Sequence, residues 1–548
     1  MPLSSLLTKS TVAAAFDQAA ANWGEYPFLC VLPETAAIYG VPSGELSYAE
    51  TQVQVAALRA AYAHAGYGHG HRVGLLLENR PAFFLHWFAL NALGVSVVPI
   101  NTDLRAAELE YLIAHSEILL AVALQTRHAD LLAAAKAAGC QLAVMQHGDA
   151  VPLATAPAPL AVQAVGELSE CALLYTSGTT GRPKGCVLQN RYFLQSGRWY
   201  ASVGGLAALQ PGKERMLTPL PLVHMNAMAY STMAMVLTGG CLIPLDRFHP
   251  GSWWASVRAS RASVVHYLGV MPAMLTKAPA TELDRAHAVR FGFGAGIDRS
   301  LHAPFEKRFG FALLEAWAMT ETGAGAVVMA SQEPRWPGTS CFGREGSDVE
   351  VKLVADDGSE PGVNEPGELL VRHAGADARY GFFSHYLKDD AATAEAWAGG
   401  WFHTGDIVQR GADGALHFID RRKNVIRRSG ENISAVEVES VLLQHPLVRA
   451  AAVCAVSDAV RGDEVFACIV APEVGAEPEA KRALAEDLVA WCLARLAYYK
   501  APGHVALVEA LPMTASQKIQ RGELRSLTTK LIAASTSFDT TALKKRQG

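Results

Sequence analysis

The chain has 548 residues, half of them hydrophobic, and a formal net charge of −5. A single hydrophobic core does not grow to this length, so we expect at least two domains. The absence of a basic stripe excludes the usual kind of nucleic-acid-binding surface. No window is long and apolar enough to be a transmembrane segment, and the first residues lack the pattern of a signal peptide, so a cytoplasmic protein is predicted.

The first half of the chain alternates short apolar runs with helical patterns. Residues 73–77 and 95–100 are apolar runs that predict buried strands, and residues 81–93 between them have helical periodicity. This order predicts a βαβ unit, and therefore a parallel sheet with helices on its faces. The same alternation returns after Leu109 and around residues 264–275.

Two segments interrupt this alternation. Residues 151–165 are rich in alanine and proline and predict a surface connection. Residues 233–245 come closest to a membrane span, but two glycines and a proline break the run, so we interpret it as a buried strand with its turn. The nine cysteines form no CxxC pair and no Cys/His spacing typical of zinc, which predicts free thiols.

The pattern changes after about residue 345, where short alternating strands with Asp-Gly turns predict a β-rich subdomain. An amphipathic helix over 437–444, strands over 450–456 and 465–470, and a helix over 478–496 then follow. Proline stands in the first turn of this last helix, where its missing N–H costs nothing. These elements predict a compact α+β module of ordinary domain size.

The predicted fold class is therefore α/β, with parallel α/β layers in a large multi-sheet N-terminal domain that includes the β-rich subdomain. A small α+β domain follows at the C-terminus. We place the boundary in the charged stretch near Arg421, which gives domains of residues 1–421 and 422–548.

The strongest local motif is Thr-Ser-Gly-Thr-Thr-Gly-Arg-Pro-Lys-Gly, which follows an apolar strand. Its glycines let the backbone turn tightly and approach an anion, and its hydroxyl groups and lysine can donate to phosphate oxygens. It is not a Walker A loop, because Gly185 follows the lysine in place of Ser or Thr. The motif predicts a phosphate-cradling loop, with a surface turn as the alternative. Its predicted phosphate-binding residues are Thr176, Ser177, Gly178, Thr179, Thr180, Gly181 and Lys184.

This loop resembles the signature of the adenylate-forming superfamily, which includes acyl-CoA synthetases, peptide-synthetase adenylation domains and luciferases. The resemblance extends from about Leu46 to Arg525, with the later motifs in the family's order. It implies a large domain with the ATP and acyl pockets and a mobile C-terminal domain that rotates about Lys423. It also implies a catalytic lysine, Lys518, although Gln517 stands where the family usually has glycine.

The sequence Glu-Ala-Trp-Ala-Met-Thr-Glu-Thr resembles the family's YGMTE stretch. The resemblance assigns Glu321 to magnesium, a hard cation that suits carboxylate oxygen, and Thr320 to the adenylate. Trp317 stands where Tyr is usual, and its ring can still stack on adenine. Ala318 stands where Gly is common at the border of the acyl pocket, beside Met319, so its methyl group is expected to narrow that pocket.

The remaining motifs complete the implied site. Asp406 ends a Gly-Trp-Phe-His-Thr-Gly-Asp motif and is assigned to the ribose hydroxyls, and Arg421 to ribose or phosphate. His224 and Met225 lie in a motif similar to one of coenzyme A ligases, where a gate to the acyl pocket and an ordinary core histidine both remain open. The other implied residues are Gly294, Ala295 and Gly296 beside the adenine and acyl groups, and Gly430 and Glu431 in the coenzyme A tunnel.

These features predict an acid–thiol ligase: an acyl-CoA synthetase that forms an acyl-adenylate from ATP and then passes the acyl group to coenzyme A, with Mg²⁺ as cofactor. The predicted catalytic residues are Thr176, Lys184, Glu321 and Lys518. The charged stretch after Phe418 most resembles the crotonobetaine/carnitine-CoA ligase group, but no aromatic cage or carboxylate for a quaternary ammonium group is apparent. A short or small branched acid is predicted.

Three alternatives remain: a ligase that loads a carrier protein, a luciferase-like oxygenase, and a non-catalytic binding paralogue. The last is disfavoured because Lys184, Glu321 and Lys518 are all present. The oligomeric state is open, with a homodimer as one alternative.

Overall fold

The computed structural model of the chain describes residues 9–104, 106–161, 164–176, 183–421, 424–428, 431–458, 462–475, 477–496, 498–513 and 519–544. These residues form two compact units. The first contains residues 9–176, 183–351 and 371–402, and the second contains residues 352–370 and 403–544. None of the helices in these ranges combines the length and the apolar character needed to cross a membrane. The domain boundary placed after Arg421 remains a prediction.

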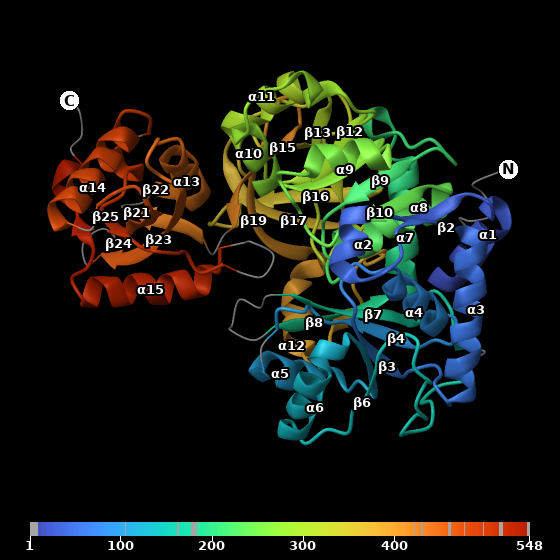
Figure 1. Cartoon of the computed structure of the whole chain (residues 1–548). Helices are drawn as coiled ribbons and strands as arrows, with labels where there is room; N and C mark the ends of the chain where they lie inside the picture. Colours follow the sequence, from blue (N-terminus) through green and yellow to red (C-terminus); the bar gives the residue numbers. More distant parts are fainter. Residues whose placement is uncertain are drawn as a thin grey trace. The chain divides into compact units, whose positions relative to one another are not determined.

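A seven-stranded sheet of the first unit contains the predicted βαβ unit (Figure 1). β3 and β4 are parallel neighbours joined by α4 (Pro81–Asn91), which confirms the assignment made from periodicity. β7 and β8 form an antiparallel hairpin at one side of this sheet, and the short strand β18 pairs with β8. In spatial order the strands are β18 (His385–Tyr386), β8 (Lys184–Gln189), β7 (Glu170–Thr176), β4 (Ser96–Pro99), β3 (Arg72–Leu76), β5 (Leu120–Ala123) and β6 (Ala143–Met145).

An eight-stranded sheet forms the other half of the first unit. Its central strands β10, β9, β11, β12 and β13 are parallel, so their carboxyl ends meet at one edge. In spatial order the strands are β14 (Val328–Met329), β13 (Ala312–Trp317), β12 (Phe291–Ala295), β11 (Val264–Leu268), β9 (Arg215–Thr218), β10 (Cys241–Pro244), β1 (Pro27–Val31) and β2 (Gly44–Ser47).

Helices cover these sheets, and one of them contacts both layers. In α7, Tyr200 lies against Phe293 of the eight-stranded sheet, with ring centroids 5.0 Å apart. Phe193 of the same helix packs on Trp87 of α4, at 5.2 Å, on the side of the seven-stranded sheet. The helices of this unit are α1 (Val12–Trp23), α2 (Pro33–Tyr39), α3 (Tyr48–His64), α4, α5 (Ala106–Ser116), α6 (His128–Ala137), α7 (Asn190–Ser202), α8 (Thr232–Thr238), α9 (Trp253–Ser260), α10 (Val270–Lys277), α11 (Arg299–Phe309) and α12 (Asp390–Ala396).

Residues 233–245 differ from the single buried strand that the sequence predicted. The first half belongs to α8, and only β10 is a strand. Every residue of both elements is buried, so no polar face reveals the helical period in the sequence. Gly239 ends α8 with a φ of 68°, a left-handed conformation that glycine adopts without strain.

In the second unit, strands β20, β19, β17 and β16 lie in that order in a sheet that corresponds to the predicted β-rich subdomain. β19 and β20 are antiparallel, with Asp406 opposite Arg421. The bounds are β16 (Val349–Val354), β17 (Pro366–His373), β19 (Phe402–Arg410) and β20 (Leu416–Arg421); the short strand β15 (Cys341–Gly343) precedes them in the chain.

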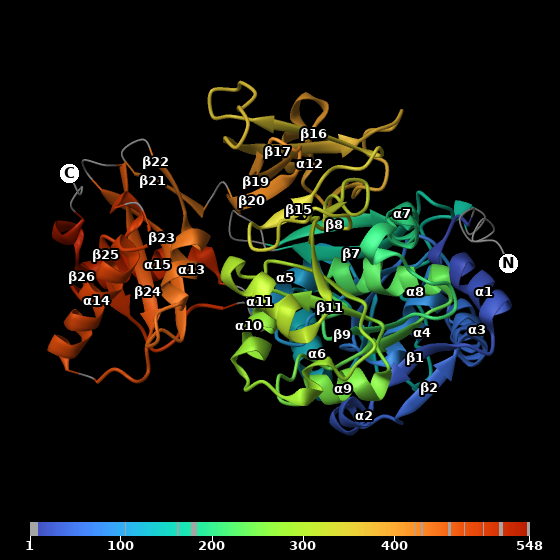
Figure 2. The same ribbon diagram turned by 90° about the horizontal axis from the view of Figure 1, so that it is seen from above.

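The C-terminal part of the second unit is an α+β module. Its sheet runs β22-β21-β24-β25-β26, with β23 paired to β24. Alternate residues of β23 and β24 face two hydrophobic clusters, one with α13 and α14 and the other with α15 on the opposite face (Figures 1 and 2). The elements are β21 (Val425–Arg428), β22 (Glu431–Ser434), α13 (Ala435–Leu443), β23 (Ala450–Asp458), β24 (Gly462–Val470), α14 (Pro478–Leu493), β25 (His504–Leu507), α15 (Arg521–Ala533) and β26 (Phe538–Asp539).

The segment after Arg525, which has little pattern in the sequence, is part of this module. β26 pairs with β25, and Lys544 beyond it forms a buried ion pair with Glu464. Arg428 Nε donates to the other oxygen of the same carboxylate at 2.8 Å. The tail therefore closes one side of the module through both strand pairing and a buried charge cluster.

Candidate active site

The predicted phosphate loop lies between two paired strand ends. Thr176 is the last residue of β7 and Lys184 is the first residue of β8, and the two are directly paired in the hairpin. Ser177, Gly178, Thr179, Thr180 and Gly181 lie outside the described residues. Because side chains of directly paired residues point to the same side of a sheet, the two ends of the loop present a hydroxyl and an ammonium group together.

Lys184 is held between an aromatic ring and a carboxylate. Its Nζ atom lies 4.8 Å from the centre of the Tyr386 ring and 3.9 Å from Asp389 Oδ2. Asp389 also caps α12, where its side chain accepts from the backbone N–H of Ala392. The Lys184 side chain keeps 24% of its surface exposed, so its ammonium group can reach a ligand from solvent.

Glu321 follows β13 and is buried, with 7% of its surface exposed. The Tyr386 hydroxyl donates to its Oε1 at 3.0 Å, and the backbone N–H of Phe383 donates to its carbonyl at 2.8 Å. Tyr386 thus contacts both Glu321 and Lys184, and it joins two sequence-predicted residues that are far apart in the chain. Burial, together with the Glu321 carboxylate, raises the pKa of Tyr386 well above its usual range, so the phenol stays a donor.

The chemistry of this group fits magnesium. A carboxylate oxygen is the ligand type that Mg²⁺ accepts, usually from one or two carboxylates together with phosphate oxygens and water. The Tyr386 phenol that donates to Glu321 is neutral, so it places no positive charge beside the carboxylate. Glu321 is therefore the residue that would hold the cation.

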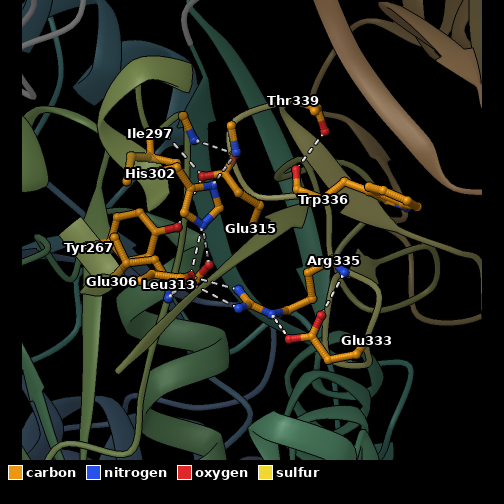
Figure 3. A network of polar contacts seen from close by, with 12 residues as sticks. Tyr267, Ile297, His302, Glu306, Leu313, Glu315, Glu333, Arg335, Trp336 and Thr339 are labelled. Atoms are coloured by element: carbon orange, nitrogen blue, oxygen red, sulfur yellow. Dashed lines mark hydrogen bonds and ion pairs between the residues drawn. The ribbon is translucent and has the colours of Figure 1, made fainter. Parts of the chain in front are cut away.

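Gly294, Ala295 and Gly296 lie at the carboxyl end of β12, beside the end of β13. A buried carboxylate fixes this turn: Glu315 Oε1 accepts from the backbone N–H of Ile297 and from the Tyr267 hydroxyl, each at 3.1 Å (Figure 3). Its Oε2 accepts from the backbone N–H of Gly296 at 3.3 Å.

Packing excludes a side chain at Gly294, and backbone conformation favours glycine at Gly296. A Cβ atom on Gly294 would lie 2.3 Å from the Tyr267 carbonyl oxygen, and Gly296 has a φ of 79°. Packing and backbone conformation are therefore sufficient to explain the two glycines of the Gly-Ala-Gly run, whether or not a ligand binds beside them.

The residues predicted to contact the adenylate and the acyl group follow β13. Trp317 is the last residue of that strand and is 6% exposed, with its ring 6.3 Å from that of Phe342. Ala318, Met319 and Thr320 follow and are half-buried. Stacking of Trp317 on adenine stays a prediction.

His224 and Met225 precede a π-helical turn, η5 (Asn226–Ser231), and His224 is exposed, which does not agree with the alternative of a core histidine. Within η5 the Tyr230 hydroxyl donates to the Gly323 carbonyl at 2.9 Å. The backbone N–H of Gly323 in turn donates a hydrogen bond to the Met319 carbonyl. The two segments predicted to line the acyl pocket are therefore joined through Tyr230. Their role as pocket walls stays a prediction.

Asp406 and Arg421, in the second unit, pair across β19 and β20. Arg421 Nε lies 3.2 Å from Asp406 Oδ1, and Asp406 is 3% exposed while nearly half of the Arg421 side chain is exposed. Lys423, Gly430 and Lys518 lie outside the described residues, and of Glu431 only the backbone is described, opposite Arg428 in the β21–β22 hairpin.

Three residues of these networks had no assigned role in the sequence analysis: Tyr386, Tyr230 and Glu315. Glu315 had a usable signal, because a carboxylate within an otherwise apolar buried strand must be hydrogen-bonded. No local pattern distinguishes Tyr386 or Tyr230 from other buried aromatic residues, since their partners lie 65 and 93 residues away.

Comparison with known proteins gives matches to AMP-binding enzymes and to CoA ligases. Residues 16–380 match the family model of AMP-binding enzymes, and residues 437–518 match that of the AMP-binding enzyme C-terminal domain. Crotonobetaine/carnitine–CoA ligase of Shigella flexneri is 28% identical over 500 residues, which cover 87% of this chain and 93% of the relative. The same enzyme of Escherichia fergusonii is 29% identical over the same shares.

Solved structures share the fold. o-Succinylbenzoate CoA synthetase (MenE) of Bacillus subtilis, in complex with its acyl-adenylate, has a TM-score of 0.78 at 23% identity and covers 93% of this chain and 97% of its own. ATP-bound MatB of Rhodopseudomonas palustris has a TM-score of 0.77 at 22% identity and covers 95% and 99%.

Proposed function

The chain belongs to the AMP-binding enzyme family, and from this premise we propose that it is an ATP-dependent acyl-CoA synthetase for a short or small branched carboxylic acid. The observation that carries the proposal is the grouping of Thr176, Lys184 and Glu321 in the first unit. A hydroxyl and an ammonium group that can donate hydrogen bonds to phosphate lie within one connected network with a carboxylate suited to a cation. Transfer of a group from a nucleoside triphosphate requires this combination.

The proposed reaction has two steps. A carboxylate oxygen of the acid attacks the α-phosphorus of ATP, a new P–O bond forms, and the bond to pyrophosphate breaks. The coenzyme A sulfur then attacks the acyl carbon, a C–S bond forms, AMP leaves, and the thiol proton passes to solvent. No protein nucleophile is needed, so catalysis consists of positioning and charge neutralisation.

Each residue has a limited task in this scheme. Thr176 and Lys184 bind phosphate oxygens, and Glu321 holds Mg²⁺, which neutralises phosphate charge when bound. Asp406 binds the ribose hydroxyls, Arg421 binds ribose or phosphate, and Lys518 assists adenylation. We further propose that the C-terminal domain, residues 422–548, reorients about Lys423 between the two steps.

A pyrophosphate-release screen over carboxylic acids, with and without coenzyme A, tests the proposal. The panel runs from acetate to palmitate and includes crotonobetaine and carnitine, the acids in the names of the related ligases. We expect acid-dependent pyrophosphate release, and thioester only when coenzyme A is present. Release without thioester, but with acylation of a carrier protein, would indicate a carrier-loading ligase. No release with any acid would favour a non-catalytic paralogue.

The Lys518→Ala variant separates the two steps. We expect it to lose pyrophosphate release and to retain thioester formation from a preformed acyl-adenylate, because Lys518 is assigned to the first step alone. Equal loss in both steps would contradict this assignment.

A further inference from the structure

The segment that carries Tyr386 is bonded to two parts of the candidate site. The backbone N–H of Phe383 donates to the Glu321 carbonyl, and that of Leu387 donates to the Gly185 carbonyl, each at 2.8 Å. Between them, Tyr386 pairs with Cys186 of β8, and its N–H donates to Thr393 Oγ1 at 3.0 Å. Its backbone is therefore fixed to the end of β8 and to the segment that follows β13.

The Tyr386 side chain is placed between two charged groups. Its hydroxyl donates to Glu321 Oε1, and the face of its ring lies under the Lys184 ammonium group, 4.8 Å from its centre. Tyr386 is 8% exposed and packs edge-on against Phe383, with ring centroids 4.7 Å apart. Both the position and the rotation of the phenol are thus set by packing.

We propose that Tyr386 is a positioning residue that holds Glu321 and Lys184 in place for the magnesium–ATP complex; this rests on the proposed function of the site. A phenol suits this task because it is neutral. A lysine or arginine donor would neutralise Glu321, whereas the phenol adds no charge to either residue, and the Asp389 carboxylate 3.9 Å from the Lys184 Nζ atom stays the acidic partner of that lysine. Through one hydroxyl and one aromatic face, Tyr386 orients both residues and leaves their charges available to the ligand.

Two substitutions separate the two contacts. Tyr386→Phe removes the hydrogen bond to Glu321 and keeps the ring under Lys184, whereas Tyr386→Leu removes both. Tyr48→Phe is the matched control, because Tyr48 is also buried and its hydroxyl donates to the Met235 and Gly240 carbonyls. A purely structural role predicts that Tyr386→Phe and Tyr48→Phe behave alike.

The measurement is binding of ATP by calorimetry, with excess Mg²⁺ and, separately, with EDTA. We expect Tyr386→Phe to weaken binding of magnesium–ATP about tenfold, the effect of losing one hydrogen bond to a charged group, and to leave binding in EDTA within about twofold of wild type. Tyr386→Leu should weaken binding in both conditions, because Lys184 also loses its support. Tyr48→Phe should change neither.

A Glu321→Gln background provides a second test that does not depend on the stability of one variant. If Tyr386 acts through the Glu321 carboxylate, adding Tyr386→Phe to Glu321→Gln should not weaken magnesium–ATP binding further. The proposal is overturned if Tyr386→Phe binds magnesium–ATP like wild type, or if its effect is the same in EDTA. A wild-type protein that binds no ATP in either condition would instead refute the proposed function.

Discussion

Thr176 and Lys184 are directly opposite each other at the end of the β7–β8 hairpin that leads into the predicted phosphate loop. Their side chains therefore lie on one side of the sheet, at the two ends of the predicted phosphate loop. This pairing means that Lys184 cannot move away from the loop without disturbing the hairpin.

Replacing Lys184 with Met should therefore reduce kcat/KM for ATP by roughly 10- to 100-fold, because it removes a charged donor to phosphate and keeps most of the side-chain volume. Steady-state pyrophosphate release at varied ATP concentration measures this. Lys388→Met is the control, since Lys388 is an exposed lysine on the β18–α12 connection that pairs with Glu117 at 2.8 Å. An equal effect of both substitutions would show that Lys184 does not contact the nucleotide.

The second prediction concerns acyl chain length. Ala318 is half-buried between Trp317 and Met319, and we expect its methyl group to limit the acyl pocket. Ala318→Gly should shift the preference towards longer acids, because one methylene of mismatch is worth roughly 1–3 kcal/mol. The measurement is kcat/KM for straight-chain acids from acetate to palmitate. A wild-type preference for palmitate would show that Ala318 does not face the acyl chain.

The third prediction concerns a buried ion pair near Glu315. Arg335 binds both oxygens of Glu306, at 2.7 and 2.9 Å, and His302 and the backbone of Leu313 also contact this carboxylate (Figure 3). Burial raises the pKa of Glu306, but the bonds from Arg335 and His302 outweigh it and lower the pKa to about 2. Glu306→Gln should reduce the free energy of unfolding by about 3 kcal/mol at pH 7.

The pH dependence of this loss follows from the sign of the shift. Because the folded pKa lies below the unfolded value of 4.5, the stabilisation is complete above pH 4.5 and is lost as the pH falls towards 2. Urea unfolding should give a constant difference between wild type and variant from pH 8 to about pH 5. Glu333 is an exposed partner of Arg335, and Glu333→Gln should reduce the free energy of unfolding by less than about 1 kcal/mol. A difference that grows below pH 4.5 would contradict this assignment.

The fourth prediction concerns two buried histidines. Burial lowers the pKa of His266 to about 3, and burial together with His147 lowers that of His86 to about 3. Between pH 6.5 and 3 the unfolded chain binds protons that the folded chain does not, so stability should fall as the pH falls below 6.5. The expected slope is about 1.4 kcal/mol per pH unit for each histidine.

His266→Gln should remove about half of this combined slope between pH 6.5 and 5, because one of the two groups no longer titrates. In the wild type, His266 Nδ1 lies 2.6 Å from Asn226 Oδ1 and His266 Nε2 lies 3.1 Å from the Tyr200 hydroxyl. The neutral amide of glutamine can therefore replace part of this hydrogen bonding. The measurement is the free energy of unfolding in urea at several pH values. Parallel profiles for wild type and variant would show that His266 is protonated in the folded protein.

The sequence by itself determined the elements that have a clear period and the motifs whose residues are adjacent. The helices α13 and α14 were predicted within a few residues, because their apolar positions repeat with the period of a helix. The β3–α4–β4 unit was also predicted within a few residues, although residues 82–91 of α4 are all buried; its length and the proline at its first turn distinguish α4 from a strand. The phosphate loop and the family were identified from adjacent residues. Residues 233–245 were assigned wrongly because α8 is completely buried and only seven residues long, so neither a polar face nor its length distinguishes it from a strand.

Only the tertiary structure decided which distant side chains meet. The bond from Tyr386 to Glu321 joins residues 65 positions apart, the bond from Tyr230 to Gly323 joins residues 93 apart, and Lys544 reaches Glu464 across 80 residues. Such contacts depend on how the strands are ordered in each sheet and on which side chains then share a buried site. A local sequence pattern carries the period of an element, whereas these pairings arise only when the packed sheets bring the elements together.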